Sequence, residues 1–294
     1  MKKNSIKGKK TGGELVLDIF KVFFVLLVSI VCVYPFWNIF IISINDGQDA
    51  LRGGLYFWPR VFTLENYQEI LRRSEFVRAI GVTVLRTLIG TPLVVLVTSM
   101  LAYVLSRSEL LGKKFWTLMF IFTMYFSGGL IPGYLLIKDL GMINSRLSLI
   151  LPGAVSTFNL MIMITGFEGI PESLEESARI DGAGDWTILF RIIMPLAKPT
   201  IMVILLYYAV GHWNAWFHAM IYLRDADKMP LQIFLRDILT RSQLGAMTGQ
   251  TDVEDVGQTI KYATIIVSTV PILCVYPFIQ KHFVKGVMIG AVKE

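Results

Sequence analysis

Long apolar runs alternate along this chain with short polar segments. Leucine, isoleucine, valine and phenylalanine gather in windows of about 20 residues or more, the length at which a helix crosses about 30 Å of hydrocarbon. Six windows are of this kind: 17–44, 76–105, 115–137, 147–167, 200–223 and 260–284. Because their apolar residues are continuous and do not alternate with polar ones, the windows predict helices rather than barrel strands. We therefore expect an all-α polytopic membrane protein with six transmembrane helices.

The composition agrees with a membrane location. Of the 294 residues, 54% are hydrophobic and 17% are charged, whereas a soluble domain is about half apolar and about a quarter charged. The net charge of +6 does not indicate nucleic-acid binding, because the basic residues are spread along the chain. The first window is too long for the hydrophobic region of a signal peptide and no cleavage site follows it, so we expect it to be retained.

A basic tail, residues 1–14, precedes the first window. Its lysines (Lys2, Lys3, Lys7, Lys9 and Lys10) predict a cytoplasmic N-terminus. Six spans would return the C-terminus to the cytoplasm, so residues 15–294 are expected to form one membrane domain. Of the loops, 45–75 is expected to hold a short helix capped by Thr63, and 224–259 reads as a polar connection.

The loop between the fourth and fifth windows, 168–199, carries signals for two helices. Pro171 suits the first turn of a helix, and Gly182 falls where the residue after a helix adopts positive φ. A second helix is expected from Asp185 to Met194, where Pro195 breaks it. The loop therefore predicts a helix, a glycine turn and a second helix.

The first of these helices offers both charge and close approach. Glu175 and Arg179 form a favourable i,i+4 pair, while Ser177 and Ala178 leave little bulk on another face. A helix pair resting on lipid headgroups is one reading. Acidic residues outnumber basic ones here, however, and an anionic leaflet would repel them, so a protein partner that offers arginines fits better. In the second helix, an apolar face is expected from Trp186, Leu189, Phe190 and Ile193.

The same loop contains a recognisable motif. Glu176-Ser177-Ala178 is followed after three residues by Gly182, and after nine more by Ile192-x-Met194-Pro195. This pattern resembles the E-A-A-x3-G-x9-I-x-L-P loop of the membrane subunits of binding-protein-dependent ABC importers. The form Asp181-Gly182-Ala183, the "WNAW" of 213–216 and the ending "YPFIQKHFVKGVMIGAVKE" resemble the carbohydrate branch, especially six-span permeases of oligosaccharide and uronide uptake.

The resemblance implies a type I ABC importer permease fold in the bacterial cytoplasmic membrane. It also implies a second permease subunit, two ATPase subunits and an extracytoplasmic solute-binding protein. The loop 168–199 would be a coupling helix seated in the ATPase, where Glu176 meets a basic residue. The residues that the resemblance assigns to coupling are Glu176, Ser177, Ala178, Asp181, Gly182, Ala183, Ile192 and Pro195. In some relatives the tail, here 285–294, also enters the ATPase interface.

The chain has no G-x-x-x-x-G-K-[ST] phosphate loop. We therefore expect a transport subunit rather than an enzyme, with ATP and Mg used by a partner ATPase and no cofactor or metal bound here. Cys32 and Cys274 fall inside predicted spans and are expected to be buried free thiols. His212 and His218 are six residues apart, so on one continuous helix they would face different directions and make a poor metal pair.

The end of the fifth window is rich in aromatic and hydrogen-bonding side chains, which suit a sugar path. The candidates there are Tyr208, His212, Trp213, Asn214 and Trp216, and Asn159 of the fourth window is a further one. An aromatic belt at the membrane interface is the alternative for Trp216, and Asn159 could instead hold two spans together. Arg86 lies well within the second window and is a functional candidate, although snorkelling or an ion pair at a subunit seam would also explain it.

Other classes of function have weaker support. An ion-driven secondary carrier would need carboxylates or broken helices at mid-membrane, but every Asp and Glu falls outside the windows or at their margins. A membrane enzyme would need a convergent catalytic constellation, and none is visible. Importers of peptides or other polar solutes share the coupling loop. The sequence therefore predicts the permease of an ATP-driven sugar importer, with a non-sugar solute as the alternative.

Overall fold

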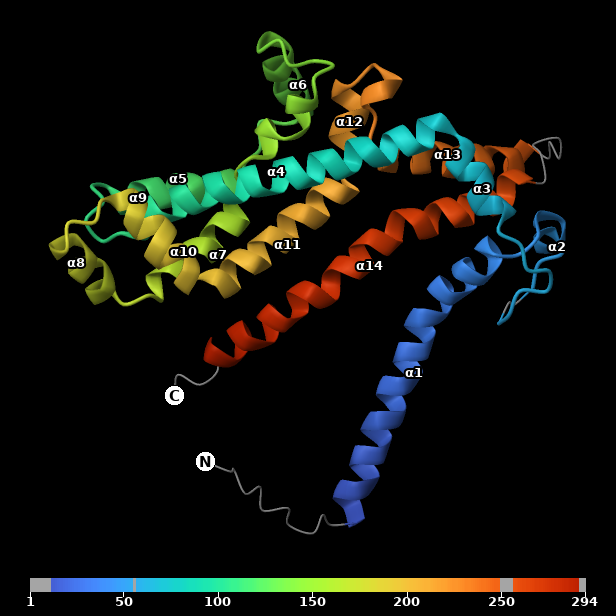
Figure 1. Cartoon of the computed structure of the whole chain (residues 1–294), viewed down its shortest axis with the longest axis horizontal. Helices are drawn as coiled ribbons and strands as arrows, with labels where there is room; N and C mark the ends of the chain where they lie inside the picture. Colours follow the sequence, from blue (N-terminus) through green and yellow to red (C-terminus); the bar gives the residue numbers. More distant parts are fainter. Residues whose placement is uncertain (1–11, 55–56, 249–255, 291–294) are drawn as a thin grey trace. The chain divides into compact units, whose positions relative to one another are not determined.

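The computed structural model describes residues 12–54, 57–248 and 256–290, and these residues are almost entirely helical (Figure 1). The longer helices are α1 (Gly12–Ser43), α3 (Glu65–Arg72), α4 (Ser74–Ser106), α5 (Lys113–Tyr125), α6 (Leu130–Asp139), α7 (Thr157–Glu168), α8 (Glu172–Ile180), α11 (Lys198–Asn214), α13 (Leu231–Thr248) and α14 (Val256–Gly290). The shorter ones are α2 (Gly47–Leu51), η1 (Arg146–Leu149), η2 (Leu151–Gly153), α9 (Asp185–Ile188), η3 (Leu189–Ile193), α10 (Met194–Leu196), α12 (Phe217–Tyr222) and η4 (Ala226–Lys228). The expected all-α class is confirmed.

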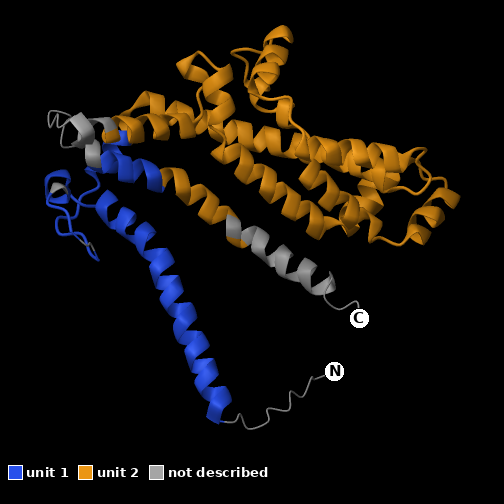
Figure 2. Ribbon diagram, turned by 180° about the vertical axis from the view of Figure 1, so that it is seen from behind, with its two compact units in different colours: residues 1–70, 244–266 blue, residues 71–243, 267–294 orange. Residues whose placement is uncertain are grey.

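The chain divides into two units, residues 1–70 with 244–266 and residues 71–243 with 267–294 (Figure 2). In the first unit, the segment after α1 is fastened by side-chain amides. Asn66 donates from Nδ2 to the carbonyls of Ser43 and Asn45, at 3.0 and 2.9 Å. Asn45 in turn donates to the buried carboxylate of Asp49 at 2.8 Å. These buried amides fix the turn that follows α1, since their hydrogen bonds replace those lost to water.

The core of the second unit lies where α4, α7 and α11 pack together. Val94, Leu160, Met163 and Ile204 are all fully buried there. A Cβ atom at Gly166 of α7 would lie only 2.6 Å from Thr200 Oγ1, so only glycine lets α7 approach the start of α11 this closely. This three-helix core is the base from which the polar loops project.

Only part of the predicted span pattern is found as uninterrupted helices. In the described part of the chain, α1 and α4 are long and apolar enough to cross a membrane. Three further stretches qualify only as bent pairs, with bends of 113° between α5 and α6, 51° before α7 and 86° between residues 185–196 and 198–214. Of the sixth window, 260–284, the described part includes an apolar helical stretch, Thr259–Val275.

The expectation of one continuous helix is therefore wrong for the third, fourth and fifth windows. The third breaks at Ser127-Gly128-Gly129, where Gly129 has φ +88°. The fourth opens with the short η1 and η2 helices, the second of which contains Pro152. The fifth is interrupted after Asn214, and α12 begins at Phe217. Hydropathy alone did not show these breaks, because all three windows stay apolar across them.

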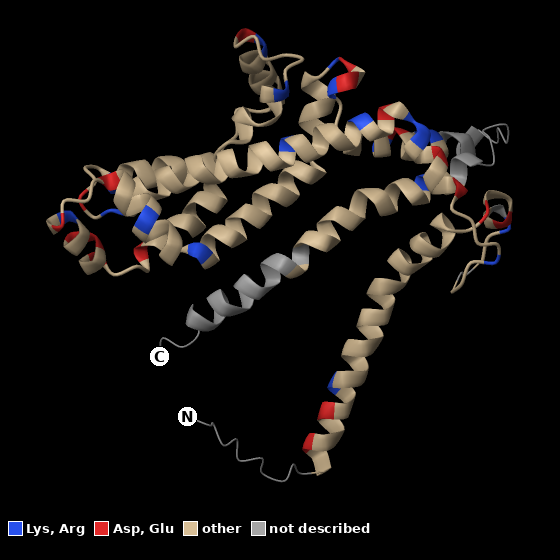
Figure 3. Cartoon of the chain, viewed as in Figure 1, with Lys and Arg blue, Asp and Glu red and all other residues tan. Residues whose placement is uncertain are grey.

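The connecting loops contain one expected helix and two that were missed. Thr63 Oγ1 accepts a hydrogen bond from Glu65 N at 3.2 Å, which confirms the predicted start of α3. The helices α2 and α13 were not predicted, and α13 occupies half of the loop expected to be a polar connection. Both cysteines are free, as expected, but their side chains are exposed and not buried. Charged residues gather at helix ends and in connecting turns, whereas α4 and α11 are uncharged over most of their length (Figure 3).

Candidate functional site

The predicted glycine turn is present at the end of α8. Gly182 has φ +83°, and Ala183 N donates to Ala178 O at 2.9 Å while Gly182 N donates to Arg179 O at 3.0 Å. This is the Schellman arrangement, in which a left-handed residue lets two amides close the last turn of the helix. Pro171 is the residue directly before α8, one position earlier than expected. The local prediction for Gly182 is therefore confirmed.

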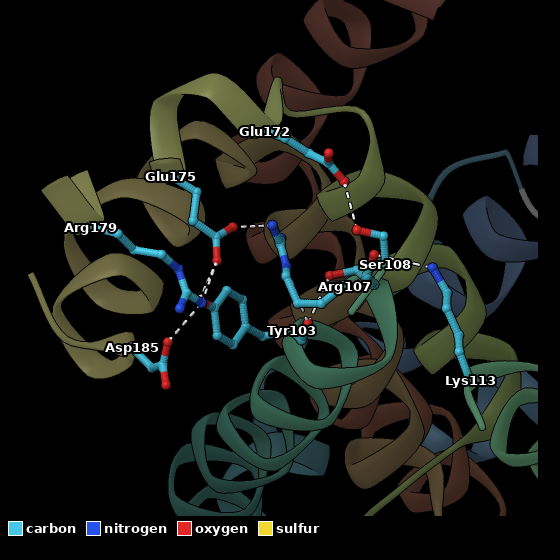
Figure 4. A network of polar contacts seen from close by, with 9 residues as sticks. Tyr103, Arg107, Ser108, Lys113, Glu172, Glu175, Arg179 and Asp185 are labelled. Atoms are coloured by element: carbon cyan, nitrogen blue, oxygen red, sulfur yellow. Dashed lines mark hydrogen bonds and ion pairs between the residues drawn. The ribbon is translucent and has the colours of Figure 1, made fainter. Parts of the chain in front are cut away.

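A buried carboxylate holds α8 against the end of α4. Glu175 is 5% exposed, and its carboxylate accepts a hydrogen bond of 2.8 Å from the Tyr103 hydroxyl. Arg107 forms an ion pair with the second oxygen of the same carboxylate, and its guanidinium also lies 4.7 Å from the centre of the Tyr103 ring. Arg179 completes the set at 3.3 Å, as the i,i+4 spacing predicts. Figure 4 shows Glu175 between its two arginines.

Two further ion pairs lie close to Glu175 and its partners. Arg179 also reaches Asp185 at 3.0 Å, and its hydrogen bond with Glu175 raises the pKa of the Arg179 guanidinium above its ordinary value. In the same neighbourhood, Lys113 Nζ lies 2.9 Å from Glu168. The turn between α4 and α5 is thus connected to α8 through Arg107 and Glu175, and to the end of α7 through Lys113 and Glu168.

The sequence predicted only part of the environment of Glu175. The i,i+4 spacing indicates its pairing with Arg179, whereas its contacts with Tyr103 and Arg107 were not predicted. The resemblance assigns coupling to its neighbour Glu176 instead. The two acids differ in environment, because Glu175 is buried and Glu176 is exposed. The helical period was a usable signal, since Glu175 and Arg179 share a face of α8 that Glu176 does not.

The motif residues occupy two kinds of position. The exposed ones are Glu176, Ser177, Asp181, Gly182 and Pro195, and the half-buried ones are Ala178, Ala183 and Ile192. The half-buried three pack against the hydrophobic core. The acidic residues of the motif, together with Ser177 and Gly182, are therefore exposed at the α8 turn, whereas its two alanines are engaged by the core.

The second helix of the loop differs from its prediction. It runs through α9, a π-helical segment at Leu189–Ile193 and α10, and does not stop at Met194. Leu189 and Ile193 are buried, but Trp186 and Phe190 stack on each other at 5.9 Å and are 62% and 42% exposed. The expected single apolar face is therefore wrong. The wider turn of the π segment changes the helical phase that a 3.6-residue period assumes.

A cavity of about 200 Å³ lies beside the core of the second unit. It is lined by three of the predicted path residues, Asn159, Tyr208 and His212. Its other lining residues are Arg86, Ser148, Leu149, Pro152, Gly153, Ser156, Tyr207, Gly211 and His218. The Tyr208 hydroxyl is already engaged with Thr98 Oγ1 at 2.9 Å and Ser156 N at 3.0 Å, so it also joins helices of the core.

Arg86 is buried at the edge of this cavity, with 8% of its surface exposed. Its guanidinium donates to the carbonyl oxygen of Leu149 at 2.8 Å and to that of Ala215 at 3.3 Å. Both carbonyls lie where a helix ends or bends, at positions whose acceptors have no partner within the helix. Snorkelling is therefore not the arrangement of Arg86 in this structure.

The remaining path candidates lie elsewhere. Trp213 Nε1 donates to Ser268 O at 2.9 Å, and its ring lines a separate apolar cavity of about 160 Å³ between α4, α11 and α14. Asn214 is exposed at the end of α11. Trp216 is also exposed, and the Arg236 guanidinium lies 4.0 Å from its ring centre, in cation–π contact. The six candidates therefore do not form one site.

The two histidines line the same cavity, contrary to expectation. His212 lies in α11 and His218 lies in α12, so the break between these helices changes the direction that a continuous helix would give. Within the described residues, no group of three or more His, Cys, Asp or Glu side chains could hold a metal ion.

Comparison with known proteins identifies the family. The profile of the family described as "Binding-protein-dependent transport system inner membrane component" matches residues 67–289. The chain belongs to this family. It is therefore an inner-membrane component of a transport system that depends on a binding protein, and the expected kinship with importer permeases is confirmed.

Two curated relatives and one solved structure are similar to the chain over most of their length. The chain is 42% identical to the polygalacturonan/rhamnogalacturonan transport system permease protein YtcP of Bacillus subtilis, over 92% of this permease and 96% of the relative. Protein LplC of the same organism is 40% identical over 96% and 97% of the two chains. Among solved structures, a chain of a bacterial ABC transporter involved in the import of the acidic polysaccharide alginate superposes with a TM-score of 0.86. It is 29% identical, and the match covers 94% of this permease and 100% of that chain.

Proposed function

We propose that this permease is one membrane subunit of an ATP-driven importer that moves a sugar or oligosaccharide across the bacterial cytoplasmic membrane. An extracytoplasmic binding protein would deliver the saccharide, and the subunit would pass it inward by alternating access. The observation that carries this proposal is the 42% identity, over nearly the full length, with a permease of a polygalacturonan/rhamnogalacturonan system. The peptide and secondary-carrier alternatives have no comparable support.

The finer architecture belongs to the same proposal. Counting each bent pair as one span gives five candidates in the described residues, and the apolar part of α14 would supply the sixth. Non-helical backbone at membrane depth is tolerated where protein or a cavity covers it. A six-span domain over 15–294, with both termini cytoplasmic, would place loop 168–199 on the cytoplasmic side. Of the tails, residues 1–11 and 291–294 lie outside the described residues.

The loop 168–199 would dock in a partner ATPase. The exposed side of the α8 turn offers Glu176 and Ser177 for this contact, and the Schellman turn at Gly182 sets the direction of the chain. Two ATPase subunits would supply ATP and Mg chemistry, and a second permease subunit would complete the pathway. By linkage, a saccharide-loaded binding protein that favours one state of the permease must also bias the nucleotide side.

The full complex tests the transport proposal. The importer would be reconstituted in proteoliposomes with its binding protein, and saccharides and peptides would be compared as stimulators of ATP hydrolysis and as imported solutes. We expect stimulation and uptake with saccharides. Stimulation by peptides alone would overturn the sugar assignment.

A charge reversal tests the docking proposal. Glu176→Lys should reduce co-purification of the ATPase and leave membrane insertion intact, because it reverses the charge offered to a basic partner residue. Glu65→Lys, at an exposed acid of α3, is the matched control and should leave ATPase recovery unchanged. Equal recovery of ATPase with both variants would refute docking through Glu176.

A further inference from the structure

One permanently charged side chain, Arg86, lines the cavity, and the lining contains no aspartate or glutamate that could neutralise it. His212 and His218 add imidazole rings to the same lining. The guanidinium of Arg86 is always protonated in proteins. A buried cation is costly unless it is paired, so this cavity favours an anionic occupant.

The hydrogen bonds of Arg86 leave capacity for a ligand. A guanidinium has five N–H groups. Within the described residues, Nη1 of Arg86 donates to Ala215 O and Nη2 donates to Leu149 O. One further N–H remains on each of the two terminal nitrogens, and these can donate to a ligand in the cavity. Nε of Arg86 and Nε2 of His212 also have no hydrogen-bond partner among the described residues, but both atoms are closed off from solvent, so a ligand reaches them only if the side chains move.

The rest of the lining suits a hydroxyl-rich molecule. Asn159 brings an amide, Ser148 and Ser156 bring hydroxyls, and Tyr207 brings an aromatic ring to the cavity. A volume of about 200 Å³ is smaller than the roughly 300 Å³ at which pockets for drug-sized ligands begin. The cavity is therefore of a size for one sugar ring.

We propose that this cavity, with Arg86 at its edge and Asn159 and His212 in its wall, binds the carboxylate of an acidic saccharide during passage. A planar carboxylate matches the donor geometry of a guanidinium, while the amide and hydroxyls meet the ring hydroxyls. The site would select uronate-containing saccharides over neutral ones. This inference rests on the proposed saccharide import and names the substrate class.

Uptake by the reconstituted complex tests the site with two probes that differ only at their carboxyl groups. These are a galacturonate trisaccharide and its fully methyl-esterified form. The variant Asn159→Asp adds a carboxylate to the wall and keeps the hydrogen bonds of Arg86. Its uptake of the acid should fall about tenfold or more relative to that of the ester, as expected when a charged hydrogen bond is opposed. Gln68→Glu, the same chemical change at an exposed site in α3, should leave the ratio unchanged.

A second variant keeps the test valid if a single change harms folding. Arg86→Lys retains the charge but loses the planar fork, and should lower the acid-to-ester ratio less than Asn159→Asp does. Because the same binding protein serves every variant, changes in this ratio report on the permease. Equal loss of both probes, or an unchanged ratio in both variants, would overturn the proposal.

Thermal unfolding of the purified complex separates this site from the transport proposal. Galacturonate should raise the unfolding temperature of the wild-type complex more than galactose does, and this difference should vanish in Asn159→Asp. Equal shifts with both sugars would refute the carboxylate site even if saccharides are imported. An importer that moves no saccharide would refute the proposed function instead.

Discussion

Two buried charges in the same unit are stabilised in opposite ways. Glu175, 5% exposed, receives hydrogen bonds or ion pairs from Tyr103, Arg107 and Arg179. Arg86, 8% exposed, has only backbone carbonyls as partners within the described residues. The carboxylate of Glu175 is neutralised within the fold, so it stabilises the packing of α8 against the end of α4. The guanidinium of Arg86 is not neutralised and lies beside a cavity, so it is available to a ligand.

The largest expected effect comes from removing the neutralised charge. Glu175→Ala should lower the free energy of unfolding by about 3 kcal/mol, because it leaves the partly buried Arg107 without its carboxylate. Thermal unfolding of the purified permease would measure this loss. Glu176→Ala, one residue along α8 and exposed, should change stability by only about 0.5 kcal/mol or less. Similar losses in both variants would show that Glu175 is no special fastening.

A double substitution sharpens the same comparison. Replacing both partners, in Arg107→Met with Glu175→Leu, removes two charges together and leaves neither unpaired. The double variant should therefore be more stable than the sum of the single losses predicts, by about 1–3 kcal/mol. A double-mutant cycle of unfolding temperatures measures this coupling, and strict additivity would show that the two residues act independently.

The turn at Gly182 should contribute less to the free energy of unfolding than the ion pair between Arg107 and Glu175. Gly182→Ala places a Cβ at φ +83°, which costs about 1 kcal/mol or somewhat more for a residue in the left-handed region. Gly184→Ala is the control, because Gly184 has an extended backbone at φ −77°. A loss with Gly182→Ala larger than that of Glu175→Ala would mean that the turn, not the ion pair, fixes α8.

The smallest effect is expected at Asp225, an exposed acid. A hydrogen bond from Lys228 is the main reason that the pKa of Asp225 lies below its ordinary value, and a hydrogen bond from Asn144 contributes as well. A depressed pKa means that this stabilisation is present above the unfolded pKa and is lost as the pH falls through the folded one. The difference in unfolding temperature between wild type and Asp225→Asn should thus be present at neutral pH and vanish in acid. A difference that grows in acid would contradict this sign.

Local features of loop 168–199 could be predicted from the sequence, whereas pairings between distant residues could not. The helical period of α8 predicted the Glu175–Arg179 pair, and Gly182 predicted the turn, because both features depend on residues within one helix. The partners Tyr103 and Arg107 lie some 70 residues earlier in the chain. Nothing in the spacing of a single sequence specifies which polar residues meet across helices.

The cavity shows a second limit of prediction from sequence, which is the position of helix breaks. Hydropathy predicted one apolar helix over 200–223, but it did not show the break between α11 and α12. That break brings His218 to the same cavity as His212, and leaves Trp216 exposed outside it. Aromatic composition suggested one path, whereas the helix break divides these residues among separate environments.

The pairing of Arg107 with Glu175 has a consequence for how such permeases diverge. The two residues belong to different loops, yet a change at either one leaves a charge without its partner. A lineage that loses the acid is therefore expected to lose the arginine as well, or to regain an acid nearby. Across many descendants, positions 107 and 175 should vary together, whereas no such link to position 107 is expected at the exposed neighbouring position 176.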